Sequence, residues 1–187
     1  MKTLLTSLVI LLLTMVSCKE NPVERTSSHY FPLEIGNEWI YEFFGDTTET
    51  LNQTVTGTMI INKLNYYILV SSNYNGTNIV GKVDTFYIRN ADGMKFYEYR
   101  PSGETLYLDF SDNITDSVYI HTYKTEDLAF FDLKIGRFSN CKLVEDFAFA
   151  RDGGSSRIYA KGVGLIRIGW FRGELQLKSA KINGKKY

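Results

Sequence analysis

The chain has 187 residues, of which 44% are hydrophobic, 22% charged and 14% aromatic. Its 21 basic and 21 acidic side chains cancel, which argues against a nucleic-acid-binding protein, because such proteins depend on neutralising phosphates. The apolar fraction is too high for a disordered chain, two cysteines are too few for a disulfide-rich miniprotein, and two histidines leave little for a zinc site or a histidine-based catalytic centre.

An uncharged apolar run opens the chain. It covers residues 4–16 and follows the single positive charge of Lys2. Its 13 residues are fewer than the roughly 20 that cross a hydrocarbon core of about 30 Å. The run therefore predicts a secretory signal peptide over residues 1–17.

The signal peptide ends in Met15-Val16-Ser17-Cys18. This sequence resembles the lipobox of bacterial lipoproteins, although that family most often has Leu where this chain has Met15. The resemblance implies that Cys18 becomes the first residue of the mature protein and is diacylated on its sulfur. Each buried CH₂ of an acyl chain contributes about 0.8 kcal/mol, so two or three chains would anchor the protein to a membrane permanently. The alternative is an ordinary signal peptide with a cysteine near its end.

The residues after Cys18 bear on the destination of the protein. Lys19 stands where enteric lipoproteins retained in the inner membrane usually carry Asp, so the resemblance implies the outer membrane. The periplasmic face and the cell surface both stay open. Residues 18–29 are polar and lack periodicity, which predicts a lipidated cysteine followed by a flexible tether, with a single domain over residues 30–187.

Beyond Tyr30, short runs rich in β-branched and aromatic residues are separated by turn residues about every ten positions. This spacing is typical of an all-β protein, and the short loops predict antiparallel neighbours. We therefore expect a single antiparallel meander of about 10–12 strands with little helix, curled into a barrel or half-barrel, and a split into a sandwich stays open as the alternative. The best helical candidate is the segment 126–133. The predicted strands cover residues 39–43, 54–61, 66–71, 85–89, 94–99, 105–110, 118–124, 141–150, 157–160, 164–170 and 174–182.

The first predicted strand has one aromatic face. Trp39, Tyr41 and Phe43 alternate with Glu38 and Glu42, and the two charges identify the solvent side. We expect the three rings to point inward, where they either fill a core or line a concavity that binds a lipophilic ligand. They are the candidate ligand-binding residues.

Three motifs together resemble a group of uncharacterised bacterial lipoproteins and secreted β-proteins. They are Phe31-Pro32-Leu33-x-x-Gly36-Asn37-x-Trp39-x-Tyr41, then Gly136-x-Phe138-x-Asn140-Cys141, then Gly162-Val163-Gly164-Leu165. The second half of the chain is also weakly similar to lipoprotein carriers of the LolA/LolB type, whose half-barrels hold acyl chains. The resemblance implies a fold and a location, but no chemistry.

No arrangement of residues in the sequence predicts catalysis. The glycines of Gly162-Val163-Gly164 lie between predicted strands, so they indicate a tight turn rather than a dinucleotide site. Cys141 is expected to be a small buried apolar residue, and His121 a strand residue without ligand partners. The acidic loop around Asp109 does not have calcium-loop spacing.

The sequence thus favours a non-enzymatic outer-membrane lipoprotein that binds a lipophilic or small ligand, or an envelope partner. We expect no metal, cofactor or nucleic acid. The alternatives are a structural or interaction protein of the envelope without a ligand, and, less favoured, a hydrolase with an unrecognised site.

Overall fold

The computed structural model describes residues 29–187 except 112–113, 117–120, 149–153 and 171–172. The predicted signal peptide, Cys18 and nearly all of the tether lie outside these residues. Within the described part of the chain the regular elements are all strands. Their bounds are β1 (Glu38–Phe43), β2 (Asp46–Ile61), β3 (Leu64–Asn75), β4 (Asn78–Asn90), β5 (Lys95–Arg100), β6 (Gly103–Asp109), β7 (Ile114–Asp116), β8 (His121–Leu133), β9 (Gly136–Ala148), β10 (Ser155–Ala160), β11 (Gly164–Trp170), β12 (Gly173–Ile182) and β13 (Lys185–Lys186).

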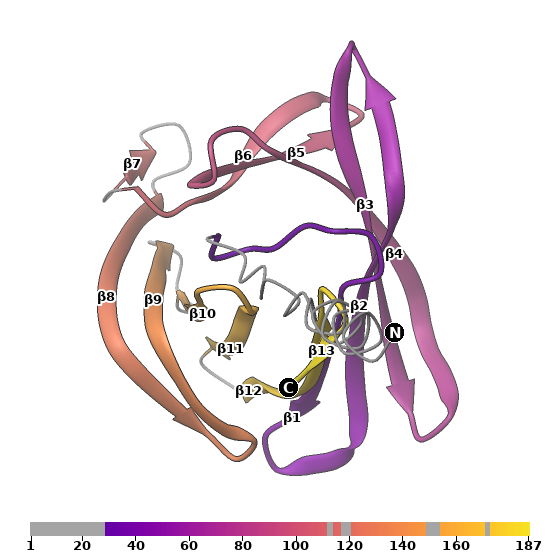
Figure 1. The fold of residues 1–187 in the computed structure, drawn as a ribbon, viewed down its shortest axis with the longest axis vertical. Coiled ribbons are helices and arrows are strands. Elements are labelled where there is room, and N and C mark those ends of the chain that lie inside the picture. Colours follow the sequence, from indigo (N-terminus) through magenta and orange to yellow (C-terminus); the bar gives the residue numbers. More distant parts are fainter. Residues whose placement is uncertain (1–28, 112–113, 117–120, 149–153, 171–172) are drawn as a thin grey trace, which may run out of the picture.

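All strands belong to one antiparallel sheet in the order β6-β5-β4-β3-β2-β1-β12-β11-β10-β9-β8-β7, with β13 paired to β12. Strands β1 to β6 pair in chain order, as do β7 to β12, and β1 also pairs with β12. The two edges are therefore β6 and β7, which follow one another in the chain. This confirms the predicted all-β meander, and the curled sheet stays open between β6 and β7 (Figure 1).

Turn chemistry accounts for several of the hairpins. Asn62 and Lys63 both have positive φ angles, of 51° and 67°, and join the paired residues Ile61 and Leu64 of β2 and β3. Asn183 and Gly184 make the same kind of two-residue turn between β12 and β13. Such turns require positive φ at both central positions, for which Asn and Gly are the preferred residues.

The predicted helical candidate over residues 126–133 is wrong, because this segment belongs to β8. It pairs along its length with β9, from Glu126 opposite Leu143 to Leu133 opposite Gly136. The long cross-strand pairing that the Gly136 turn allows stabilises this segment more than a short helix with the same apolar residues would. Tertiary pairing thus overrides a short local pattern.

The segment before β1, residues 29–37, crosses the interior of the curled sheet (Figure 1). Phe31 is 4% exposed, and the centroid of its ring lies 5.6 Å from that of Phe96 in β5 and 6.5 Å from that of Tyr159 in β10. The segment therefore packs against both halves of the sheet from within. The interior is filled here by the protein's own side chains.

Side chains also bridge the two halves where the ladder of backbone hydrogen bonds is interrupted. Phe110, just after β6, lies 5.9 Å from Phe96 and 4.9 Å from Tyr159 between ring centroids. The Lys142 ammonium donates a hydrogen bond of 2.9 Å to the backbone oxygen of Phe110 and lies 3.2 Å from a carboxylate oxygen of Asp127. A mostly buried lysine is tolerated because both contacts satisfy its charge.

Two of the sequence motifs meet in the core, although about 124 residues separate them. The Trp39 indole Nε1 donates to the backbone oxygen of Val163 at 2.6 Å, and the Tyr41 hydroxyl donates to that of Leu165 at 3.1 Å. Gly164 lies between these acceptors with φ +106°, and a Cβ there would fall 2.9 Å from Trp39 Nε1. Glycine is thus required at this position because the backbone has positive φ and because a Cβ would collide with the indole.

Asn37 explains another position of the first motif. Its side chain, 1% exposed, donates to the backbone oxygen of Pro32 at 2.9 Å and accepts from the backbone N–H of Asn183 at 2.8 Å. Its backbone oxygen accepts from Val55 N–H at 2.9 Å. One asparagine therefore ties the interior segment to β2 and to the end of β12.

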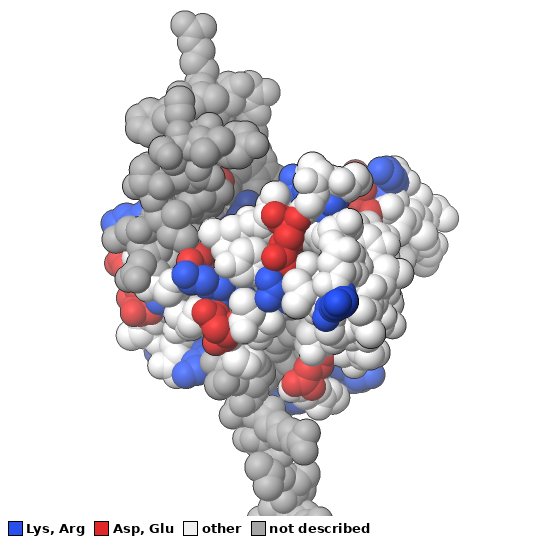
Figure 2. Space-filling model, turned by 90° about the horizontal axis from the view of Figure 1, so that it is seen from above, with Lys and Arg blue, Asp and Glu red and all other residues white. Residues whose placement is uncertain are grey.

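Charges are dispersed over the surface. On the face shown in Figure 2, acidic and basic side chains lie interspersed among uncharged residues rather than gathered by sign. Ion pairs between strands include Arg89 with Glu104 at 2.9 Å and Arg137 with Asp132 at 2.7 Å. This face therefore presents no extended region of one sign.

Candidate functional site

The three aromatic residues predicted to face inward do so to different extents. Trp39 and Tyr41 are 0% and 1% exposed, and both hydrogen-bond to the backbone of the β10–β11 region. Phe43 is partly buried, and its ring meets that of Trp170 edge-on at 6.4 Å. The predicted inward face is confirmed. Contact of these three residues with a ligand stays a prediction, since Trp39 and Tyr41 are enclosed by protein atoms.

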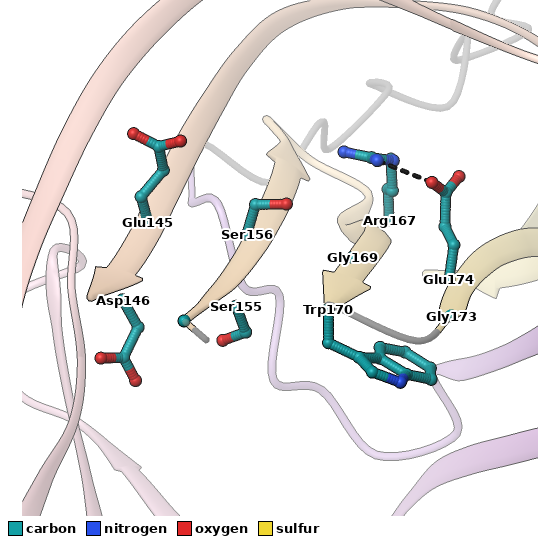
Figure 3. Close-up of a pocket in the computed structure, with 10 residues that line it drawn as sticks. Glu145, Asp146, Ser155, Ser156, Arg167, Gly169, Trp170, Gly173 and Glu174 are labelled. Atoms are coloured by element: carbon teal, nitrogen blue, oxygen red, sulfur yellow. Dashed lines mark hydrogen bonds and ion pairs between the residues drawn. The ribbon is translucent and has the colours of Figure 1, made fainter. Parts of the chain in front are cut away.

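A pocket of about 300 Å³ lies at the ends of β9, β10, β11 and β12 (Figure 3). We call it the Trp170 pocket. It forms where β10 and β11 separate, beyond their last backbone pair, Ser156 with Gly169. The residues that line it are Glu145, Asp146, Gly154, Ser155, Ser156, Arg167, Gly169, Trp170, Gly173 and Glu174.

Strand alternation divides the polar side chains of the Trp170 pocket into two groups. Asp146, Ser155 and Trp170 point to one side of the sheet, as Figure 3 shows. Glu145, Ser156, Arg167 and Glu174 point to the other. The register explains this division, because Asp146 pairs with Ser155 and Glu145 pairs with Ser156 on the adjacent strands.

Arg167 and Glu174 form the charged pair of the pocket. Arg167 Nη2 donates to a carboxylate oxygen of Glu174 at 2.6 Å, and Gln176 Nε2 donates to the other oxygen. The hydrogen bond from Arg167 lowers the pKa of the Glu174 carboxyl, so Glu174 is ionised at neutral pH. The centroid of the Phe131 ring lies 5.9 Å from the Arg167 guanidinium carbon. The arginine is therefore held in place from two sides.

Trp170 is supported on one side and open on the other. It is 38% exposed, and its indole lies so close to Gly173 that a Cβ at that glycine would fall 2.9 Å from ring atom Cζ2. Neither Gly173 nor Gly169 has a positive φ, so neither is required by its own backbone. A Cβ at Gly169 would fall 2.9 Å from Ser156 Oγ and 3.1 Å from Arg167 Nη2. Both glycines instead leave room for the side chains of the pocket.

The pocket presents hydrogen-bond donors and acceptors side by side. Arg167 supplies N–H donors, the carboxylates supply acceptors and the serine hydroxyls can do either. Within the part of the chain that the structure describes, no group of three or more His, Cys, Asp or Glu side chains could hold a metal ion. In the same residues, no helix has the length and hydrophobicity needed to cross a bilayer.

The structure also describes the surroundings of other residues singled out in the sequence. Cys141 is 1% exposed, and burial raises the pKa of its thiol, as expected for a small core residue. Gly162, with φ +79°, lies in the predicted turn before β11, and Gly164, with φ +106°, begins that strand. His121 begins β8, but its side chain lies outside the described part of the structure. Asp109 pairs with Lys95 at 3.5 Å.

The sequence interpretation placed Trp170 only at the end of a predicted strand and did not recognise the pocket. All of its lining residues except Gly154 lie on four strands, and no motif joins them. The available signal was local. Gly169 lies inside a predicted strand, where glycine is unfavourable unless something approaches closely, and Gly173 directly precedes another predicted strand.

The arrangement defines the class of the protein as an open, curled antiparallel meander with a polar pocket at one end. Two solved structures are similar to this chain. A "putative exported protein with YmcC-like fold" from Bacteroides fragilis has a TM-score of 0.53 and 11% identity, covering 82% of this chain and 99% of that one. A "putative lipoprotein" from Parabacteroides distasonis has a TM-score of 0.49 and 12% identity, covering 83% and 99%. No family model and no curated protein matches the chain.

Proposed function

We propose that this chain is a lipoprotein of the outer membrane, anchored through acyl chains on Cys18, whose β domain is a non-enzymatic binding module. The lipobox-like Met15-Val16-Ser17-Cys18 supports the anchor, and the polar residues that follow it support a tether. The fold shared with the "putative exported protein with YmcC-like fold" of Bacteroides fragilis fits a place in the cell envelope.

The Trp170 pocket is the observation that carries the binding role. Its volume of about 300 Å³ lies at the lower end of the range typical of small-molecule sites, ~300–1,000 Å³. Oriented polar groups and one open aromatic ring supply directional contacts. We therefore favour a small polar ligand, or a polar group of an envelope partner, at this end of the sheet.

A lipophilic ligand in the interior is the weaker candidate. Such a ligand would have to displace residues that fill the curled sheet, including Phe31 and Trp39, which are 4% and 0% exposed. Displacing them would also break the Trp39 hydrogen bond to Val163. The same filled interior is the specific observation that favours the second candidate function, an envelope interaction protein without a small ligand.

The anchor and the binding role need separate experiments. Cys18→Ser should release the protein from membranes upon cell fractionation, with Cys141→Ser as the matched control that stays with the membrane. Retention of a processed Cys18→Ser protein in the membrane fraction would contradict the anchor. Native mass spectrometry of the purified protein should detect a co-purified small molecule or partner, and its loss in Trp170→Ala would support the pocket. A ligand that survives this substitution would place binding elsewhere.

A further inference from the structure

We propose that the Trp170 pocket binds the ring of a saccharide, stacked on the indole of Trp170 and hydrogen-bonded through its hydroxyl groups. This inference rests on the proposed binding role and names the chemical class of the ligand. It follows from three features of the described residues: a supported and open aromatic ring, a mixed set of donors and acceptors, and the presence of both charge signs.

The indole of Trp170 forms a preorganised platform. It rests on Gly173, where a Cβ would fall 2.9 Å from the ring, and meets Phe43 edge-on at 6.4 Å. It is nevertheless 38% exposed, so part of its surface remains available. The face of an aromatic ring is electron-rich. The C–H groups on one face of a pyranose are polarised by their oxygens, and they fit such a surface through many weak contacts.

The polar lining suits hydroxyl groups, because each hydroxyl both donates and accepts. Asp146 and Ser155 point to the same side of the sheet as Trp170, as Figure 3 shows, so a ring stacked on the indole lies near acceptors and a hydroxyl. On the other side, Arg167 and Glu174 present a donor and an acceptor next to each other, 2.6 Å apart. Two neighbouring hydroxyls of a sugar match such a pair.

The charges of the pocket favour a neutral ligand. The lining holds three carboxylates and one guanidinium, so an anion would meet net repulsion. A cation would have to displace Arg167, which already pairs with Glu174 at 2.6 Å. A neutral polyhydroxylated molecule uses both signs without desolvating an ion.

The two tryptophans of the chain allow the proposal to be tested in one spectrum. Trp39 is buried and hydrogen-bonded, whereas Trp170 is open to the pocket, so their indole N–H signals report on the core and on the pocket separately. We would label the full chain with ¹⁵N-tryptophan, extract it in a detergent without sugar head groups, and titrate it with glucose, N-acetylglucosamine and cellobiose. Glycerol, acetate and putrescine serve as acyclic, anionic and cationic comparisons.

The expected result is a saturable shift of the Trp170 signal with at least one sugar, at a dissociation constant of about 1 mM, because a small ligand on an open site gains little binding free energy. The Trp39 signal should not move. The inference is overturned if no sugar shifts the Trp170 signal. It is also overturned if putrescine or acetate shifts it more strongly than every sugar. In that case the pocket binds an ion, and the proposed binding role survives without the saccharide.

Two pairs of variants tie binding to the pocket. Gly173→Ala should displace the indole and weaken sugar binding at least about tenfold, whereas Gly57→Ala, where a Cβ meets only Ile68 Cδ1 at 3.8 Å, should not. Trp170→Ala should abolish sugar binding, which saturation-transfer NMR detects on the sugar's own signals. Phe130→Ala removes a 53% exposed ring outside the pocket and should leave sugar binding unchanged. An unchanged Trp39 signal shows that each variant is folded. Unaltered sugar binding in both pocket variants would refute the site.

Discussion

Replacing Trp39 with alanine tests how β1 is built into the core. The side chain is 0% exposed, lies 6.0 Å from the Phe31 ring between centroids and donates a 2.6 Å hydrogen bond to Val163. Deleting a buried large aromatic residue costs about 3–5 kcal/mol. Part of that loss comes from the Val163 oxygen, because a buried acceptor left without a donor costs about 1–3 kcal/mol. Trp39→Phe, which retains much of the packing, should therefore cost about 1–3 kcal/mol.

Urea unfolding followed by circular dichroism measures these differences, with Trp170→Ala as the matched control. Trp170 is 38% exposed, so its loss should cost about 1 kcal/mol. Folded domains are stable by only about 5–15 kcal/mol, so the Trp39→Ala effect is a large fraction of the total. If Trp39→Ala cost no more than Trp170→Ala, the indole would not be a core residue and the assigned inward face of β1 would be inverted.

Four further substitutions address other parts of the account. Asn37→Ala should cost about 2–4 kcal/mol in the same urea assay, because the buried backbone oxygen of Pro32 and the backbone N–H of Asn183 both lose their partner, and a cost below about 1 kcal/mol would count against this role. Gly164→Ala should cost about 3 kcal/mol and Gly184→Ala about 1 kcal/mol. Both glycines have positive φ, but only at Gly164 would a Cβ lie against an indole. Equal costs would mean that the indole contact is unimportant. The hydrogen bond from Arg89 lowers the folded pKa of the Glu104 carboxyl below its usual 4.5, so the stabilisation is present above that pH and lost as the pH falls through the folded value. Glu104→Gln should accordingly be less stable than wild type at pH 7 and equally stable in acid, and a difference that persisted in acid would rule out this ionisation as its source.

Much of the fold could be predicted because its signals are local. Alternation in β1 identified the buried rings, and Asn-Gly turns marked the ends of strands. The open edge could not be predicted in the same way. The pairing of β1 with β12 and the absence of a ladder between β6 and β7 depend on how the whole sheet curls. The segment 126–133 shows the converse, since its local pattern predicted a helix, whereas its pairing with β9 makes it a strand.

The candidate site was less accessible to sequence reasoning. Trp39 and Tyr41 were identified from their pattern, and that pattern reports burial rather than ligand contact. Trp170 gave no comparable signal, because the residues around it come from four strands and meet only through their register. Only Gly169 and Gly173 indicated that other side chains approach the backbone closely, and which side chains these are is known only from the structure.

The intact mass of the mature protein extracted from membranes tests the central claim, a lipid anchor at Cys18, most directly. The account predicts a chain that begins at Cys18 and carries a diacylglyceryl group on its sulfur, with or without a third acyl chain on its amine. Fragmentation should place all of the added mass on that first residue. A mature chain that begins at another residue, or that begins at Cys18 without acyl chains, would contradict the account.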